Sequence, residues 1–279
     1  MTPAAYERLQ IRVPLGIAAA AAWATVAALS SERKLVAFCS GDAWSGVSLD
    51  RFAFAMTLYP PAGLAGEWML MIAAMMMPML AGAVEHIHAR SLSRRRPRSL
   101  ALFMIGYWAV WAACGVPIVL AVLALQLMQP SSVVTIALVG TVVLGWQFSP
   151  AKQVCLNRCH DKPPLAAYGI AADLSALRYG VTQAIWCCGT CWALMLVPLT
   201  MQDGHFPAMA AASAYLVAER LDPPQRPAWQ MRWPSTVFRL LMFRLGHWLR
   251  SDLAGAATGP TRICVSEPAD RRGRHPHGK

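Results

Sequence analysis

Long apolar runs, separated by short polar and basic stretches, dominate this chain. Six of them are candidates for helices that cross a lipid bilayer, at residues 14–30, 66–85, 100–128, 131–149, 180–200 and 205–219. About 20 apolar residues are needed to cross the hydrocarbon core, so the last run, which is short and contains Pro207, is the weakest candidate. The pattern predicts an all-α, polytopic helical membrane protein with about six transmembrane helices.

The polar stretches predict the remaining organisation. Residues 32–65 have a mixed composition and are expected to form a loop, with an interfacial piece around FAFAMTLY. After Glu219 the chain becomes basic, and the stretch STVFRLLMFRLGHWLRS alternates apolar and basic residues at the spacing of a helix that lies on a membrane surface. We therefore expect a transmembrane domain over residues 1–219 and a cytoplasmic basic tail with an amphipathic helix over residues 220–279.

The basic residues predict the orientation. Of the 25 Lys and Arg residues, only Arg33, Lys34 and Arg51 fall in segments that six spans would place outside the cell. The loops 85–99 and 150–179, the N-terminal stretch and the tail hold all the others. Loops rich in Lys and Arg stay in the cytoplasm, so both chain ends are expected inside.

Composition excludes several classes of protein. The 279 residues are 56% hydrophobic and 14% charged, whereas a soluble domain carries about 25% charged residues. The formal charge of +11 is what a nucleic-acid-binding protein would carry, but in a membrane protein loop charge sets orientation, so no nucleic-acid partner is expected. The sequence has no phosphate-binding loop and no dinucleotide fingerprint, which argues against an ATP-driven pump.

Sulfur is concentrated in two of the expected helices. Cys187, Cys191 and Met195 follow one another at intervals of four residues, which places three sulfur atoms on one helical face. In an earlier helix Met75 and Met79 share a face and Met76 lies on the adjoining one. Both sets fall near the middle of their spans, so the two helices can bring them together at one depth.

Thiolates and thioethers are soft ligands that select Cu(I), so the two sulfur sets predict a copper site. The alternative is that Met and Cys here only fill space in apolar packing. A third set, Cys155, Cys159 and His160, lies just cytoplasmic of the fourth span, where a C-x-x-x-C spacing on a helical turn brings two thiols near one ion. This set would deliver or receive metal, or would consist of ordinary loop thiols.

Four ordered motifs between Glu67 and Glu219 resemble a bacterial family of predicted metal-binding integral membrane proteins, some of which are labelled copper chaperones. They are A-M-M-M-P-M at 74–79, G-Y-W-x-x-W at 106–111, W-Q-F-S-P-A-K-Q-V-C-L-N-R-C-H at 146–160 and C-C-G-T-C-W-A-L-M at 187–195. The resemblance implies a multi-pass protein of the cell inner membrane. Many members have His-Gly where this chain has Gln183-Ala184, and an aliphatic residue at Cys188, so the resemblance supports Cys187 and Cys191 more than Cys188.

Three functions remain open from these residues. The first is a Cu(I)-binding membrane protein, not an enzyme, that holds or relays metal to or from a partner protein. Its expected ligands are Met75, Met76, Met79, Cys187, Cys191, Met195, Cys155, Cys159 and His160. The second is a membrane thiol-disulfide oxidoreductase that uses Cys187 or Cys188 with Cys191, and Cys155 with Cys159 as a relay pair, although its thiols would face the reducing side of the membrane. The third is an accessory membrane subunit without a ligand.

Overall fold

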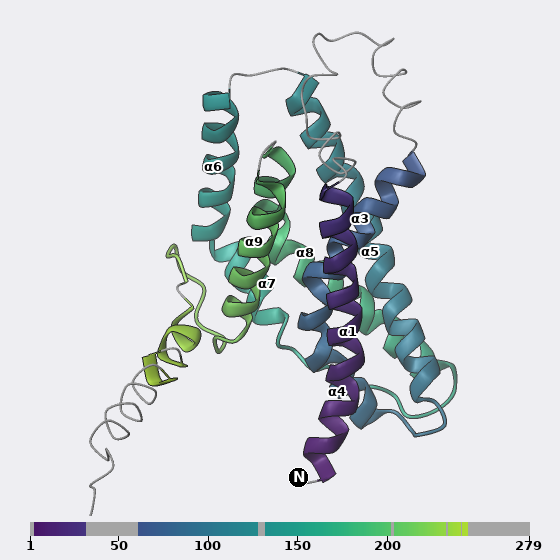
Figure 1. Ribbon diagram of the computed structural model, residues 1–279. Coiled ribbons are helices and arrows are strands. Elements are labelled where there is room, and N and C mark those ends of the chain that lie inside the picture. The colour runs from purple at the N-terminus through teal and green to yellow at the C-terminus, as the bar shows by residue number, and fades with distance from the viewer. Residues whose placement is uncertain are drawn as a thin grey trace, which may run out of the picture. The chain divides into compact units, whose positions relative to one another are not determined.

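A computed structural model describes residues 3–31, 61–127, 132–201, 204–232, 234–240 and 242–244. All the elements it describes are helices, as the apolar runs predict. They are α1 (Pro3–Ser31), α3 (Pro61–Met76), the 3-10 helix η3 (Met77–Leu80), α4 (Ala81–Arg90), α5 (Arg96–Leu127), α6 (Ser132–Phe148), α7 (Pro150–Arg158), α8 (Gly169–Thr200) and α9 (His205–Arg220). Figure 1 shows the long helices running roughly alongside one another.

The chain forms two compact units, residues 1–235 and 236–279. All the helices named above belong to the first unit. In the second unit the described residues 236–240 and 242–244 are helical, with Phe238 and Phe243 exposed, and the amphipathic tail stays a prediction.

Several described helices are long and apolar enough to cross a membrane. They are Ala5–Leu29, Ala62–Arg90, Arg96–Val122 and Gly169–Thr200, and α6 with α7 adds a fifth if this pair, bent by 61°, counts as one span. The sixth expected segment forms α9, whose 16 residues rise only about 24 Å, less than the roughly 30 Å of a hydrocarbon core. The described part of the protein is therefore all-helical, with four or five helices able to span a membrane.

Several helices extend beyond the predicted spans; α1, for example, begins at Pro3 instead of residue 14, and two predicted loops are shorter than expected. Residues 61–65, expected in a loop, already belong to α3, while residues 32–60, with the expected interfacial piece, lie outside the described part of the chain. The stretch 150–179 is also more helical than expected, because α7 occupies its beginning and α8 begins at Gly169 instead of Gly180. In both places the helix continues beyond the apolar run that was recognised: residues 61–65 of α3 are Pro, Ala, Gly, Leu and Ala, whereas the first turns of α8 include Asp173, Ser175 and Arg178.

Small residues allow the central helices to approach closely. A Cβ atom at Gly180 of α8 would lie 2.1 Å from the carbonyl oxygen of Phe103, and one at Gly106 of α5 would lie 2.7 Å from that of Leu177. Membrane helices pack closely where glycine lets their backbones meet. The aromatic side chains of Phe103, Tyr107 and Trp111 are fully buried around this contact. The pair α5–α8 is thus central: α3 and α4 pack against α5, and α6, α7 and α9 pack against α8, while α1 packs on α3, η3 and α4.

Ion pairs gather basic residues from separate segments. Arg95, just before α5, and Arg98, in its first turn, both pair with Asp173 near the start of α8, at 3.1 and 2.7 Å. Arg12 of α1 pairs with Glu85 of α4 at 2.7 Å. Segments whose charge predicts one side of the membrane are therefore in contact with one another.

Candidate functional site

A small pocket lies where η3, α7, α8 and α9 meet. The space open to the centre of a water-sized sphere is about 10 Å³, which is roughly what one water molecule or one metal ion needs. Most of its lining side chains carry sulfur or are apolar, and two are charged. They are Met76, Met79, Leu156, Cys187, Thr190, Cys191, Leu216, Glu219 and Arg220.

On α8, the three sulfur residues predicted to share a face are all buried. Cys187 and Cys191 line the pocket, and the Cys191 thiol donates to the carbonyl oxygen of Cys187 at 3.1 Å. Met195 is fully buried one turn beyond them and does not line the pocket. The interval of four residues on a continuous helix is what stacks the two thiols toward one space.

The methionines of α3 and η3 approach these thiols. The Sγ atom of Cys187 lies 3.8 Å from the Sδ atom of Met76, and Met79 lines the same pocket. Met75 is fully buried but lies outside the pocket lining. Pro78, at the start of η3, lacks the amide hydrogen that an α-helix would use, and the chain tightens into a 3-10 turn there.

Tyr107 of α5 completes the surroundings of Cys187. Its hydroxyl donates a hydrogen bond to the Cys187 Sγ atom at 3.3 Å, and the ring is fully buried. Nothing in the sequence pairs Tyr107 with Cys187, because the two residues are 80 positions apart. The tyrosine belongs to the G-Y-W-x-x-W motif, which gives that motif a place at the site.

On α7, Cys155 and Cys159 take different positions. The Cys155 side chain packs on Gly189 of α8, where a Cβ atom would lie 2.7 Å from the sulfur. The Cys159 sulfur lies 3.5 Å from the Thr190 hydroxyl and accepts a hydrogen bond from Arg220 at 3.2 Å. Burial raises the pKa of the Cys159 thiol to about 11, although the Arg220 guanidinium acts in the opposite direction. Cys159 is thus beside the pocket, next to two residues that line it.

His160 is held by main-chain groups. Its Nδ1 atom lies 3.0 Å from the Leu156 carbonyl oxygen and its Nε2 atom 3.1 Å from that of Arg220. A metal ion would have to displace one of these contacts. Gln183, at the position where many members of the resembled family have histidine, donates through Nε2 to the carbonyl oxygen of Cys159 at 3.2 Å.

Two further thiols lie apart from the pocket. Cys188 of α8 is buried and interacts with Cys114 of α5, and neither lines the pocket. Within the described part of the chain, no three His, Cys, Asp and Glu side chains group closely enough to hold a metal ion. Any metal in the pocket would therefore depend on thioether sulfur as well as on thiols.

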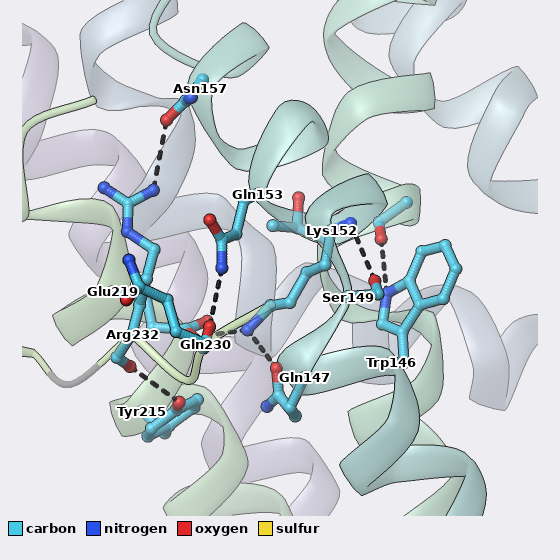
Figure 2. A network of polar contacts seen from close by, with 12 residues as sticks. Trp146, Gln147, Ser149, Lys152, Gln153, Asn157, Tyr215, Glu219, Gln230 and Arg232 are labelled. Carbon is cyan, nitrogen blue, oxygen red and sulfur yellow. Dashed lines mark hydrogen bonds and ion pairs between the residues drawn. The ribbon is translucent and has the colours of Figure 1, made fainter. Parts of the chain in front are cut away.

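The polar residues of the Trp146–His160 motif hold the segment that follows α9. Lys152 is buried and contacts the side chains of Gln147 and Glu219, as Figure 2 shows. Gln153 bonds with the backbone of Ala228 through both ends of its amide, at 2.7 and 2.9 Å. Asn157 accepts from Arg232 at 3.1 Å.

This network fixes one wall of the pocket. Glu219 pairs with Lys152 through Oε1, while its buried Oε2 atom has no hydrogen-bond partner within the described structure. Sequence reasoning singled out neither Glu219 nor Arg220. The only available signal was an acidic and a basic residue side by side at the end of an apolar helix, which is also how an ordinary helix end looks.

Comparison with known proteins gives one positive result. A protein-family model, that of the PpoB2 family described as copper chaperones, matches residues 65–242. No curated protein and no solved structure matches the chain. The matched range includes every residue that lines the pocket.

Proposed function

Because this chain belongs to the PpoB2 copper chaperone family, we propose that it is a membrane protein that binds Cu(I) and holds it or relays it to a partner protein. The observation that carries the proposal is the pocket in which Cys187 and Cys191 meet Met76 and Met79. It combines two thiols with two thioethers in a space of about the size of one ion.

The chemistry of these ligands favours Cu(I). Thiolate and thioether sulfurs are soft donors, and Cu(I) is the soft ion that such donors select, whereas Mg²⁺ prefers oxygen ligands. Met75, Met195, Cys155, Cys159 and His160 remain predicted ligands or relay residues. Of these, Cys159 has the strongest support, because it contacts Arg220 at the edge of the pocket.

The topology that we propose has six spans and both chain ends in the cytoplasm, within the cell inner membrane. The sixth span would be α9, which is short but packs against α8 and α3. Cys159 directly follows α7 and Arg220 is the last residue of α9, and both lie on the side that we propose as cytoplasmic. Metal would therefore exchange there with a donor or acceptor protein. The role is one of binding, and the proposal includes no catalysed reaction.

The experiment that tests this function compares two double variants of the purified full-length protein. Under reducing conditions the wild type is expected to retain about one copper ion per chain, since the pocket has room for one. Cys187→Ser/Cys191→Ser should lose that copper while remaining folded, because the substitutions change little in volume. Elemental analysis measures the stoichiometry, and circular dichroism in detergent checks the helices.

The control is Cys114→Ser/Cys188→Ser, which also removes two thiols from α5 and α8 but leaves the pocket lining intact. It should keep its copper. Unchanged copper in a folded Cys187→Ser/Cys191→Ser protein would contradict the proposal. Retention of zinc in place of copper would instead indicate a harder, thiolate-only site.

A further inference from the structure

Arg220 places a positive charge at the wall of the sulfur pocket. Its Nη2 atom donates to the Cys159 sulfur at 3.2 Å, and electrostatic interactions join it to Cys187 and Cys191. No carboxylate lies within ion-pair distance of its guanidinium in the part of the chain that the structure describes. Within the described structure, the groups nearest to Arg220 that can supply a balancing negative charge are therefore these three thiols, once they lose their protons.

The other charges around the pocket cancel. Of its lining residues only Glu219 and Arg220 are charged. Glu219 forms an ion pair with Lys152, and the exposed fractions of these two side chains are 1% and 3%, so that the pair is isolated from water. The charge left over at the pocket is therefore the single positive charge of Arg220.

This excess charge matches one kind of metal complex. A thiol loses its proton when it binds a metal, so coordination by Cys187 and Cys191 contributes two negative charges. A monovalent ion between them leaves a complex of charge −1, which Arg220 neutralises. A divalent ion leaves a neutral complex, and the positive charge of Arg220 then stays uncompensated in surroundings of low dielectric constant, where that is costly.

We propose that Arg220 is a specificity-determining residue, which makes the sulfur pocket selective for monovalent over divalent soft ions by supplying the counter-charge of a bis-thiolate complex. This inference rests on the proposed function, because it assigns the pocket to a metal. It goes beyond that function because it specifies the charge of the bound ion and the residue that selects for this charge. The thioethers of Met76 and Met79 are neutral and do not alter the charge count.

The test compares Ag(I), a monovalent soft ion without redox chemistry, with Cd(II), a divalent soft ion. Both affinities are measured by competition titration on the full-length protein in detergent. In Arg220→Gln the ratio of Ag(I) to Cd(II) affinity should fall by at least about tenfold, as expected when one charge near a partly buried ion is removed. Arg220→Lys keeps the charge and should keep the ratio within about threefold.

The outcomes separate this inference from the function beneath it. An unchanged ratio in Arg220→Gln, or an equal fall in Arg220→Lys, would overturn it, because charge would then not be the cause. If copper binding by the wild type depends on Cys187 and Cys191, but the ratio of Ag(I) to Cd(II) affinity does not change in Arg220→Gln, the proposed function stands and the inference fails. If copper does not depend on those cysteines, both fail.

Folding of the variant is handled by a second substitution and by the wild type. Arg220→Leu also removes the charge and, unlike methionine, adds no sulfur ligand to the pocket, so either neutral variant can give the ratio. The wild-type protein provides a check that needs no substitution. If it held Cd(II) more tightly than Ag(I) through Cys187 and Cys191, the inference would be overturned.

Discussion

Cys187 is the residue in which the site's contacts converge. Its sulfur accepts a hydrogen bond from the Tyr107 hydroxyl at 3.3 Å and lies 3.8 Å from the sulfur of Met76. Side chains of α3, α5 and α8 thus meet at this atom. Cys188, its neighbour in sequence, turns away to Cys114. Adjacent residues of a helix point about 100° apart, which is why one of the two cysteines lines the pocket and the other does not.

The hydrogen bond from Tyr107 gives a prediction at this scale. Removing the hydroxyl in Tyr107→Phe should weaken Cu(I) binding by about tenfold, because a hydrogen bond to a charged sulfur contributes about 1.5 kcal/mol or more. The ring itself stays, so helix packing should persist. Competition titration of the purified protein measures the change. Tyr168→Phe, at a side chain that is 73% exposed, is the matched control and should bind copper like the wild type.

At the scale of elements, the apolar pattern was enough to locate the long helices, because each carries a long run of apolar residues. It missed α7 and the outer turns of α3 and α8, which lie beyond the apolar runs that were recognised. The sulfur face of α8 was also predictable, since an interval of four residues means one face in any helix. The contact of that face with the methionine-rich segment was expected from matching depth, and in the structure Cys187 contacts Met76 at the end of α3.

The close approach of α5 and α8 gives the prediction at this scale. A methyl group added in Gly180→Ala would meet the backbone oxygen of Phe103, which cannot move aside as a side chain would. Overpacking of this kind costs about 1–3 kcal/mol. Gly140→Ala on α6, where a Cβ atom would have nothing within 4 Å, is the matched control. Equal unfolding midpoints of the two variants in a denaturant titration would contradict the close packing.

At the scale of the whole molecule, contacts between distant segments escaped the sequence. Lys152 and Glu219 are 67 positions apart, and each looks like a charged residue at the end of an apolar run. Only the packing of α7 against the end of α9 turns them into a buried pair. For the same reason Arg220 could not be recognised as part of the sulfur-lined pocket. The third cysteine set was placed correctly on a helical turn, but only Cys159 comes near the pocket lining.

The prediction at this scale concerns the orientation in the membrane. Reporter fusions at Ser93, at Ala167 and at the C-terminus should all give a cytoplasmic signal, because basic loops stay inside. A fusion within residues 32–60 should give the opposite signal. An external signal at Ser93 would show that the Arg-rich stretch lies outside the cell. It would then contradict the cytoplasmic side that we propose for metal exchange.

The polar network that joins α7 to α9 and to the segment after it has a consequence for how the protein is made. The pocket draws its lining from residues as early as Met76 and as late as Arg220. When the ribosome has synthesised every cysteine of α7 and α8, it has therefore not yet synthesised α9, which contributes Leu216, Glu219 and Arg220 to the pocket lining. Until α9 emerges, Lys152 also lacks its ion-pair partner Glu219. The nascent chain thus offers open thiols first and an enclosed pocket only near the end of synthesis, and a chain that stops before residue 219 has the sulfur atoms without the pocket.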